Sequence, residues 1–145
     1  MKKIIWIVPL AFLVSCGSTS QDSDSSDDST DGTSLTATLS SIQSEIFTPS
    51  CALSGCHSST SAQGGLSLAN GEAFSNLVGV DSSEATSLKR VLASDPDNSY
   101  LINKLEGTQA DVSGSGSQMP KNAAALSQAD IDVIRLWITN GAENN

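Results

Sequence analysis

Two cysteines stand beside the only histidine of the chain in the stretch Thr48-Pro49-Ser50-Cys51-Ala52-Leu53-Ser54-Gly55-Cys56-His57. A Cys-x-x-Cys-His run is typical of c-type haem attachment, in which both thiols bond to the haem and the histidine binds its iron. Here four residues separate the thiols, so the turn between Cys51 and Cys56 must bulge, and Gly55 is the residue suited to it. The stretch therefore predicts haem attachment at both cysteines, with His57 as the proximal iron ligand.

The first residues have the layout of an exported, lipid-anchored protein. Lys2 and Lys3 precede an apolar run, residues 4–14, that is short for a bilayer span and predicts a secretory signal peptide. Leu13-Val14-Ser15-Cys16 looks like a bacterial lipobox, so residues 1–15 are expected to be removed and Cys16 lipidated. Several acyl chains on one cysteine would hold the protein stably at a membrane. A retained transmembrane anchor or a plain signal peptide are the alternatives.

A tether is expected between the lipid and the folded domain. Residues 16–34 are rich in Ser, Asp, Thr and Gly, with five aspartates and no large apolar side chain. Such a segment cannot bury anything, so we expect it to stay extended, with the folded domain at residues 35–145. Loss of the signal peptide leaves five of the seven basic residues against all 16 acidic ones. This balance excludes nucleic acid as a partner and favours a protein partner with a basic docking surface.

Lipidation of Cys16 leaves Cys51 and Cys56 as a pair in an oxidising compartment. Such a pair forms a disulfide, bonds to haem or binds a metal. Zinc is set aside, because with His57 the pair supplies three ligands and no obvious fourth. Nucleophilic catalysis by Cys56 and His57 fits poorly, because adjacent side chains point apart and no third orienting group is evident.

Hydrophobic spacing predicts an all-α domain of three to five helices joined by long loops, without a strand-dominated region. The apolar face of the last helix is expected to pack through Ile131, Ile134 and Ile138. The expected helices are residues 39–47, ended by Pro49; residues 73–78, opened by Asn70 as N-cap; residues 99–105, closed by Gly107; and a last helix opened by Ser127, with Asp130 at its N3 position, and closed by Gly141.

A second iron ligand is sought far along the chain, and Met119 is the only methionine left after the signal peptide. It stands before Pro120 at the end of a Gly/Ser loop, whose flexibility suits a sulfur that must reach over a flat ligand. Ligation by histidine and methionine raises the reduction potential, which favours electron transfer over oxygen binding. Ordinary core packing is the alternative for Met119. The expected core has few aromatic residues, and a haem would fill it.

These residues resemble the small c-type cytochrome domains of exported bacterial lipoproteins, related to planctomycete-type cytochrome c domains, many of which have the Cys-x4-Cys-His spacing. The resemblance covers nearly all of residues 35–145. It implies a cytochrome c-like fold around one covalent haem c, with the first and last helices crossing beside it. The matching segments are residues 46–57, 64–68, 95–101, Met119-Pro120 and 134–142.

The expected function is that of a lipid-anchored monohaem c-type cytochrome of the bacterial cell envelope, periplasmic or on the outer surface. It would pass single electrons between protein partners and would not be an enzyme. Peroxidase-like catalysis needs a distal acid or base, which the single histidine, used as iron ligand, does not supply. The alternative is a haem-free structural or binding lipoprotein in which Cys51 and Cys56 form a disulfide.

Overall fold

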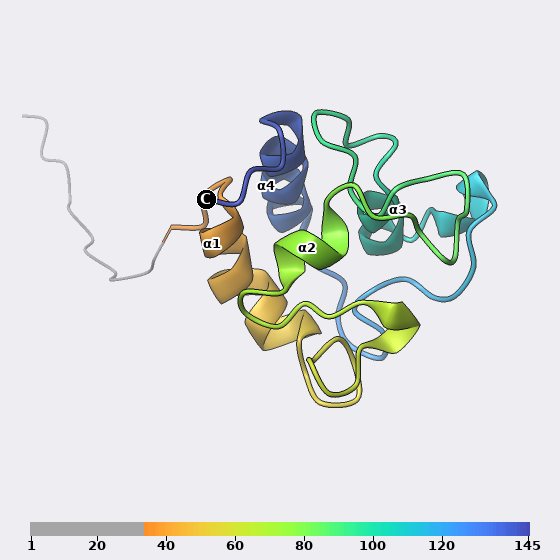
Figure 1. Cartoon of the computed structure of the whole chain (residues 1–145), viewed down its shortest axis with the longest axis horizontal. Helices are drawn as coiled ribbons and strands as arrows, with labels where there is room; N and C mark the ends of the chain where they lie inside the picture. Colours follow the sequence, from red (N-terminus) through yellow and green to blue (C-terminus); the bar gives the residue numbers. More distant parts are fainter. Residues whose placement is uncertain (1–33) are drawn as a thin grey trace, which may run out of the picture. The chain divides into compact units, whose positions relative to one another are not determined.

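The computed structural model describes residues 34–145. The predicted signal peptide, the predicted lipidation site Cys16 and the tether up to residue 33 lie outside the described residues. Within residues 34–145 all named elements are helices, which confirms the all-α prediction. The β-type pairing in this part of the chain consists of isolated bridges, such as that between Val78 and Val91. The elements are α1 (Leu39–Ile42), η1 (Gln43–Cys51), η2 (Gln63–Gly65), α2 (Ala73–Leu77), α3 (Tyr100–Glu106), η3 (Gln109–Val112) and α4 (Gln128–Thr139) (Figure 1).

The first helix continues further than its sequence predicts. α1 passes directly into η1, a π-helix that contains Pro49 and reaches Cys51. The expected end at Pro49 is therefore wrong. In an α-helix the proline ring would clash with the carbonyl four residues earlier, whereas a π-helix closes on the fifth residue. The N–H of Ala52 donates to the carbonyl of Phe47, five residues earlier, at 2.7 Å. Cys51 is therefore the last residue of the helical segment.

The hydrophobic core contains residues from the first helical segment, α1 and η1, and from the last helix, α4. α4 contacts both α1 and α3 (Figure 1). Trp137 of α4 and Phe47 of η1 are the largest fully buried side chains. The predicted packing face of α4 is confirmed, and these are the buried hydrophobic residues of the core: Leu39, Ile42, Ile46, Phe47, Leu68, Ala73, Leu77, Val91, Ile102, Leu105, Ile131, Ile134, Trp137, Ile138 and Ala142.

Local capping signals set both ends of α4 and the end of α3. The Ser127 hydroxyl oxygen accepts a hydrogen bond from the Asp130 N–H at 3.2 Å, which confirms the predicted N-cap. Gly107 is the left-handed C-cap of α3, also as predicted. Gly141 has a φ of 106°, one residue beyond the C-cap of α4, which is Asn140. A side-chain oxygen at the N-cap and glycine after the last turn therefore act here as expected.

The predicted N-cap of α2 is wrong. α2 begins after Glu72, whose side chain makes no capping hydrogen bond. A turn in which the Glu72 N–H donates to the Ala69 carbonyl at 2.9 Å precedes the helix. Asn70 lies inside this turn, too early in the chain to satisfy the first amides of α2. The Glu72 carboxylate instead accepts a hydrogen bond from the hydroxyl of buried Ser67.

The last described residue lies against the first helix. The Leu39 N–H donates to Asn145 Oδ1 at 2.9 Å, and the Ser40 N–H donates to the Asn145 main-chain oxygen at 2.8 Å. Figure 1 shows the C-terminus beside α1. Trp137 Nε1 donates to the Glu143 carbonyl at 2.9 Å, which fixes the segment leading there. Helix N-terminal amides, which lack partners within the helix, are thus satisfied by Asn145.

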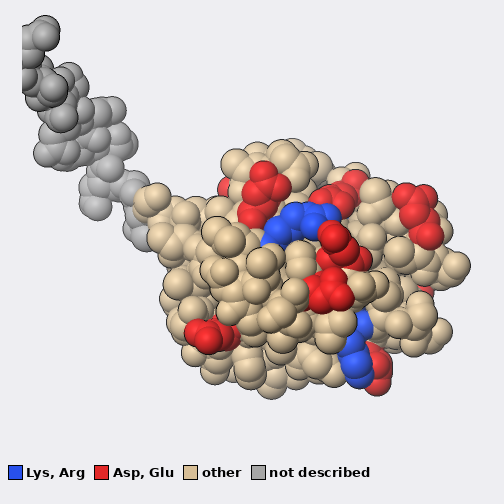
Figure 2. Space-filling model, turned by 90° about the horizontal axis from the view of Figure 1, so that it is seen from above, with Lys and Arg blue, Asp and Glu red and all other residues tan. Residues whose placement is uncertain are grey.

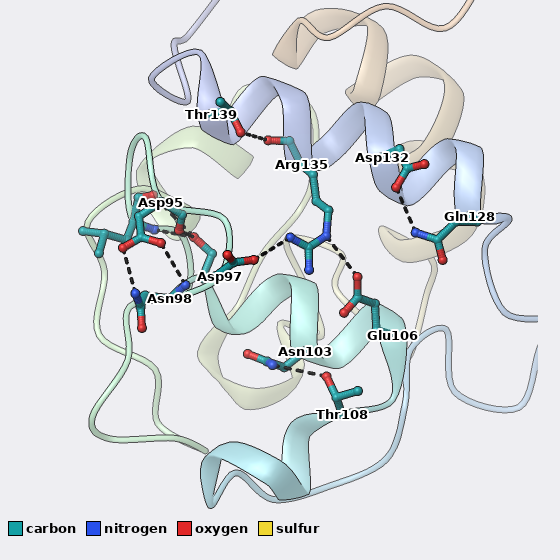
Figure 3. Close-up of polar contacts among 12 residues, drawn as sticks. Asp95, Asp97, Asn98, Asn103, Glu106, Thr108, Gln128, Asp132, Arg135 and Thr139 are labelled. Carbon is teal, nitrogen blue, oxygen red and sulfur yellow. Dashed lines mark hydrogen bonds and ion pairs between the residues drawn. The ribbon is translucent and has the colours of Figure 1, made fainter.

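Ion pairs link α3, α4 and the loop before α3. Arg135 of α4 donates through Nε to Glu106 at 3.0 Å and through a terminal nitrogen to Asp97 at 2.8 Å (Figure 3). On the face shown in Figure 2, acidic side chains are widespread and the basic ones lie beside them. Among residues 34–145, no helix is long and apolar enough to cross a membrane.

Candidate functional site

The two cysteines lie at the ends of a hydrogen-bonded turn. Cys51 ends η1, and its carbonyl accepts a hydrogen bond from the His57 N–H at 3.0 Å. Inside the turn, the Cys56 N–H donates to the Leu53 carbonyl at 3.0 Å. Gly55 has a φ of +79°, the left-handed conformation that a bulge between the cysteines requires and that glycine adopts without strain. The extra residues of the wider spacing are thus accommodated in this turn.

The imidazole of His57 has a defined hydrogen-bond partner. Its Nδ1 lies 3.1 Å from the carbonyl oxygen of Leu66. A carbonyl oxygen only accepts, so Nδ1 carries the proton, and in the neutral ring Nε2 keeps a lone pair. The His57 carbonyl in turn accepts a hydrogen bond from the Leu68 N–H at 2.8 Å. The ring is therefore oriented by a second segment of the chain, and Nε2 can bind a metal.

Both thiols are free and half-buried. Burial, and after it the neighbouring Cys56, raises the pKa of the Cys51 thiol to about 11. The chain from residue 46 to residue 71 contains no Lys or Arg that could stabilise a thiolate. A catalytic or metal-binding cysteine needs a lowered pKa, because the thiolate is the reactive form. The surroundings of Cys51 therefore disfavour nucleophilic catalysis and favour a protonated thiol.

Met119 is half-buried and packs against the same hydrophobic core as Cys51 and Leu66. Its N–H donates to the Lys104 carbonyl at 2.8 Å. The preceding segment is also hydrogen-bonded to α3, since Gln118 Nε2 donates to the Leu105 carbonyl at 2.8 Å. The end of the Gly/Ser loop is therefore hydrogen-bonded to α3, and its flexibility stays a prediction.

Two cavities open elsewhere on the surface. One, of about 270 Å³, is lined by residues on both sides of Met119, among them Gln118, Pro120 and Lys121. The other, of about 150 Å³, lies beside Asn145. Neither has a cysteine or His57 in its lining. Cys51 and Met119 pack against the hydrophobic core, whereas Cys56 and His57 are half-buried and follow Cys51 in the turn.

Within residues 34–145, no three His, Cys, Asp or Glu side chains gather as a cluster that could hold a metal ion by themselves. Cys51, Cys56 and His57 lie within seven residues of one another, and the imidazole bonds to the Leu66 carbonyl. Zinc prefers four tetrahedral ligands, mostly thiolate and imidazole. The described residues therefore add no fourth ligand to the three considered from the sequence.

Sequence reasoning missed the main-chain partner of His57. The stretch Gly64-Gly65-Leu66 is visible as a segment that follows the motif, but a carbonyl acceptor has no side-chain signal. It also missed Lys104, which is buried on α3 between Asn103 and Leu105. A lysine on the apolar face of a short helix was the available signal. Buried lysines are rare unless they are paired.

Comparison with protein-family models, with curated proteins and with solved structures finds no match to this chain. The helices described above show that residues 34–145 form an all-α domain. The chemistry of the site is interpreted from the residues of this chain and their contacts.

Proposed function

We propose that the protein is a lipid-anchored monohaem c-type cytochrome of the bacterial cell envelope that passes single electrons between protein partners. In this proposal Cys51 and Cys56 attach the haem, His57 binds the iron from the proximal side and Met119 from the distal side. The hydrogen bond from His57 Nδ1 to the Leu66 carbonyl carries the proposal. Metal-binding histidines almost always donate their other N–H to such an acceptor, which fixes the ring and makes the ligating nitrogen more basic.

The other residues of the site fit the same group. Two half-buried thiols flank a turn, and Met119 packs on the core that Cys51 also contacts. The bound haem would supply a one-electron iron couple. Buried, uncharged surroundings disfavour the additional positive charge of ferric iron, and thioether ligation acts in the same direction. The absence of charged residues between Glu45 and Glu72 therefore supports electron transfer at a raised potential.

A cytochrome c-like arrangement is part of the proposal. α1 leads without interruption through η1 to Cys51, and α1 contacts α4. In the proposed fold these first and last helices pack beside the haem and set the position of the attachment turn. The burial of Ile42 and Phe47 on one side and of Ile134 and Trp137 on the other supports this packing.

Anchoring through Cys16 and docking to a basic surface complete the proposal. The whole chain has a formal net charge of −9. Lys89, Lys104 and Arg135 each pair with a carboxylate, so much of the positive charge of the domain is neutralised locally. The remaining negative charge would attract a basic partner and increase its association rate at low salt. Nucleic acid would be repelled.

The decisive experiment is expression in a host that matures c-type cytochromes. The purified protein should keep haem through denaturing electrophoresis and acid acetone, and a peptide spanning residues 51–57 should carry the mass of one haem. A C51A/C56A double variant is the matched control and should be colourless. A colourless wild-type protein whose peptide is two hydrogens lighter than the reduced form would overturn the proposal and support the haem-free, disulfide-bonded lipoprotein.

A further inference from the structure

An ion pair between a buried lysine and a half-exposed glutamate lies against the loop that leads to Met119. Lys104 of α3 is only 7% exposed, and its Nζ lies 2.9 Å from Oε2 of Glu84. The same Nζ donates to the Ser115 carbonyl at 3.2 Å, and the Tyr100 hydroxyl donates to that carbonyl at 2.9 Å. The Tyr100 hydroxyl also lies 3.3 Å from Glu84. Lys104 and Tyr100 therefore both donate to one carbonyl of the loop, and Glu84 contacts both of them; these three residues are called the Lys104 cluster below.

Two glycines allow the loop to lie directly on this cluster. A Cβ added to Gly114 would come within 2.5 Å of Tyr100 Cε2 and 2.6 Å of its hydroxyl. A Cβ added to Gly116 would come within 2.8 Å of Lys104 Nζ, and Gly116 has a φ of +81°. Both contacts are closer than any side chain permits. The backbone of residues 114–116 is thus in direct contact with the ion pair and the tyrosine.

Lys104 binds both ends of the segment from Ser115 to Met119. Its side chain holds the Ser115 carbonyl, and its main-chain carbonyl accepts the Met119 N–H at 2.8 Å. A buried ammonium group is costly without its partners, so Lys104 has little freedom to leave Glu84 and Ser115. Movement of Met119 away from the core therefore requires either a broken main-chain bond at Lys104 or separation of the loop from the cluster.

We propose that the Lys104 cluster is a positioning element for Met119, which keeps the methionine sulfur at the iron and resists its displacement by outside ligands. This inference rests on the proposed function for the role of Met119 as iron ligand. Preorganisation of a ligand by hydrogen bonds outside the metal site raises its effective affinity. The cluster acts through the backbone of residues 115–119 and does not itself touch the cofactor.

The test compares K104M with K89M in the haem-loaded protein. Lys89 also forms an ion pair, with Asp81 at 2.6 Å, but that pair is at the surface and does not contact the loop. Imidazole binding to the ferric protein should become about tenfold tighter or more in K104M, since one or two hydrogen bonds no longer hold the loop. K89M should stay within about twofold of wild type. Equal imidazole affinities of K104M and K89M would overturn the inference.

Y100F provides a second, gentler variant. It removes only the hydroxyl that donates to Ser115. It should tighten imidazole binding in the same direction as K104M but less. If K104M does not fold, an unchanged imidazole affinity in Y100F alone overturns the inference.

Amide hydrogen exchange gives a readout that needs no haem. The Met119 amide, which donates to the Lys104 carbonyl, should exchange about tenfold faster in K104M or Y100F than in K89M, because the loop then opens more often. Equal exchange rates overturn the inference whether or not haem is present. If the wild-type protein carries no haem, the proposed function fails, and the proposed role at iron fails with it even where exchange is faster. Faster exchange combined with unchanged imidazole affinity in a haem-loaded protein also overturns the inference, because the cluster then stabilises the loop without affecting the iron ligand.

Discussion

His57 Nδ1 lies 3.1 Å from the carbonyl oxygen of Leu66, nine residues further along the chain. The return bond from the Leu68 N–H to the His57 carbonyl, at 2.8 Å, holds the main chain of the histidine to the same segment. Side chain and backbone of His57 are thus both fixed by residues 66–68. Met119, in contrast, packs against the core and is hydrogen-bonded only through its main-chain N–H, to Lys104. The two proposed iron ligands should therefore respond differently to mutation.

M119A should retain covalent haem but lose the thioether ligand. Its reduction potential should fall by a substantial part of the roughly 0.8 V range that axial ligands span, because a harder ligand or water favours ferric iron. Potentiometric titration measures the change. L126A is a suitable control, since Leu126 is another half-buried residue against the core and has no proposed ligand role. A potential equal to that of wild type would remove Met119 from the site.

The thiol of Cys51 should react slowly in the reduced, haem-free protein. Its pKa is raised from the ordinary 9.0 to about 11, first by burial and then by Cys56. The thiolate is the reactive form, so at about pH 8 its population should be roughly a hundredfold lower than in the unfolded chain. Iodoacetamide labelling followed by peptide mass analysis measures both rates. A Cys51 that labels as fast in the folded protein as in urea contradicts this prediction.

The same shift links folding stability to alkaline pH. Below pH 9 the thiol is protonated in both states, whereas between 9.0 and about 11 the unfolded chain loses its proton first. The free energy of unfolding should therefore fall across this window, by up to about 3 kcal/mol for a shift of this size. Urea unfolding at several pH values tests this. C51A is the control, because its stability should fall less over the same window.

Arg135 should contribute moderately to stability through its two carboxylate partners (Figure 3). R135A should lower the free energy of unfolding by about 1 kcal/mol. E106Q should cost more than D97N, because the Glu106 side chain is 25% exposed and the Asp97 side chain is 83% exposed. Q128A is a control, since Gln128 bonds only to Asp132 on the surface of the same helix. Urea denaturation measures all four variants; a larger loss in D97N than in E106Q would contradict the ranking.

Glycine-to-alanine substitutions should separate steric contact from backbone strain. G114A should lower the free energy of unfolding by about 1–3 kcal/mol, because its Cβ would overlap Tyr100. G55A should cost only about 1 kcal/mol, because nothing lies within 4 Å of its Cβ and only the φ of +79° opposes alanine. Thermal unfolding compares the two. The steric explanation fails if G55A is the more damaging change.

Lipidation is tested at Cys16, outside the described residues. In the bacterial host, C16S should move the protein from the membrane fraction to the soluble fraction and abolish incorporation of labelled fatty acid. Covalent haem, if the proposal holds, should be unaffected in the C16S variant. A wild-type protein that takes up no fatty acid would contradict lipid anchoring while leaving the haem site untouched.

The helices were predictable where a local signal decides them. The Ser127 cap and the Gly107 stop depend on side chains within a few residues, and both predictions are confirmed. The prediction that the first helix ends at Pro49 was wrong because it assumed α-helical hydrogen bonds, whereas η1 is a π-helix. The prediction of Asn70 as the N-cap of α2 was wrong because a turn between Ala69 and Glu72 separates Asn70 from this helix. These errors concern how a helix begins or ends, which the hydrophobic spacing of a sequence does not specify.

The site was predictable only in part, for a related reason. Adjacency in the chain brings Cys56 and His57 together, but their chemistry as haem ligands stays a prediction. The contact of His57 with Leu66 and that of Lys104 with Ser115 join segments nine and eleven residues apart. Both acceptors are main-chain carbonyls, which every residue possesses. Composition therefore indicated a loose loop before Met119 where tertiary contacts hold it in place.

The contact of Asn145 with the amides of Leu39 and Ser40 has a practical consequence for handling the protein. An affinity tag fused after Asn145, or trimming by a carboxypeptidase, would disturb the start of the helical segment that ends at Cys51. A spectroscopic difference between such a preparation and the untagged protein would then result from the altered C-terminal contact and not from the native structure. A cleavable tag placed within the Ser/Asp-rich stretch before residue 34 leaves Asn145 itself unaltered.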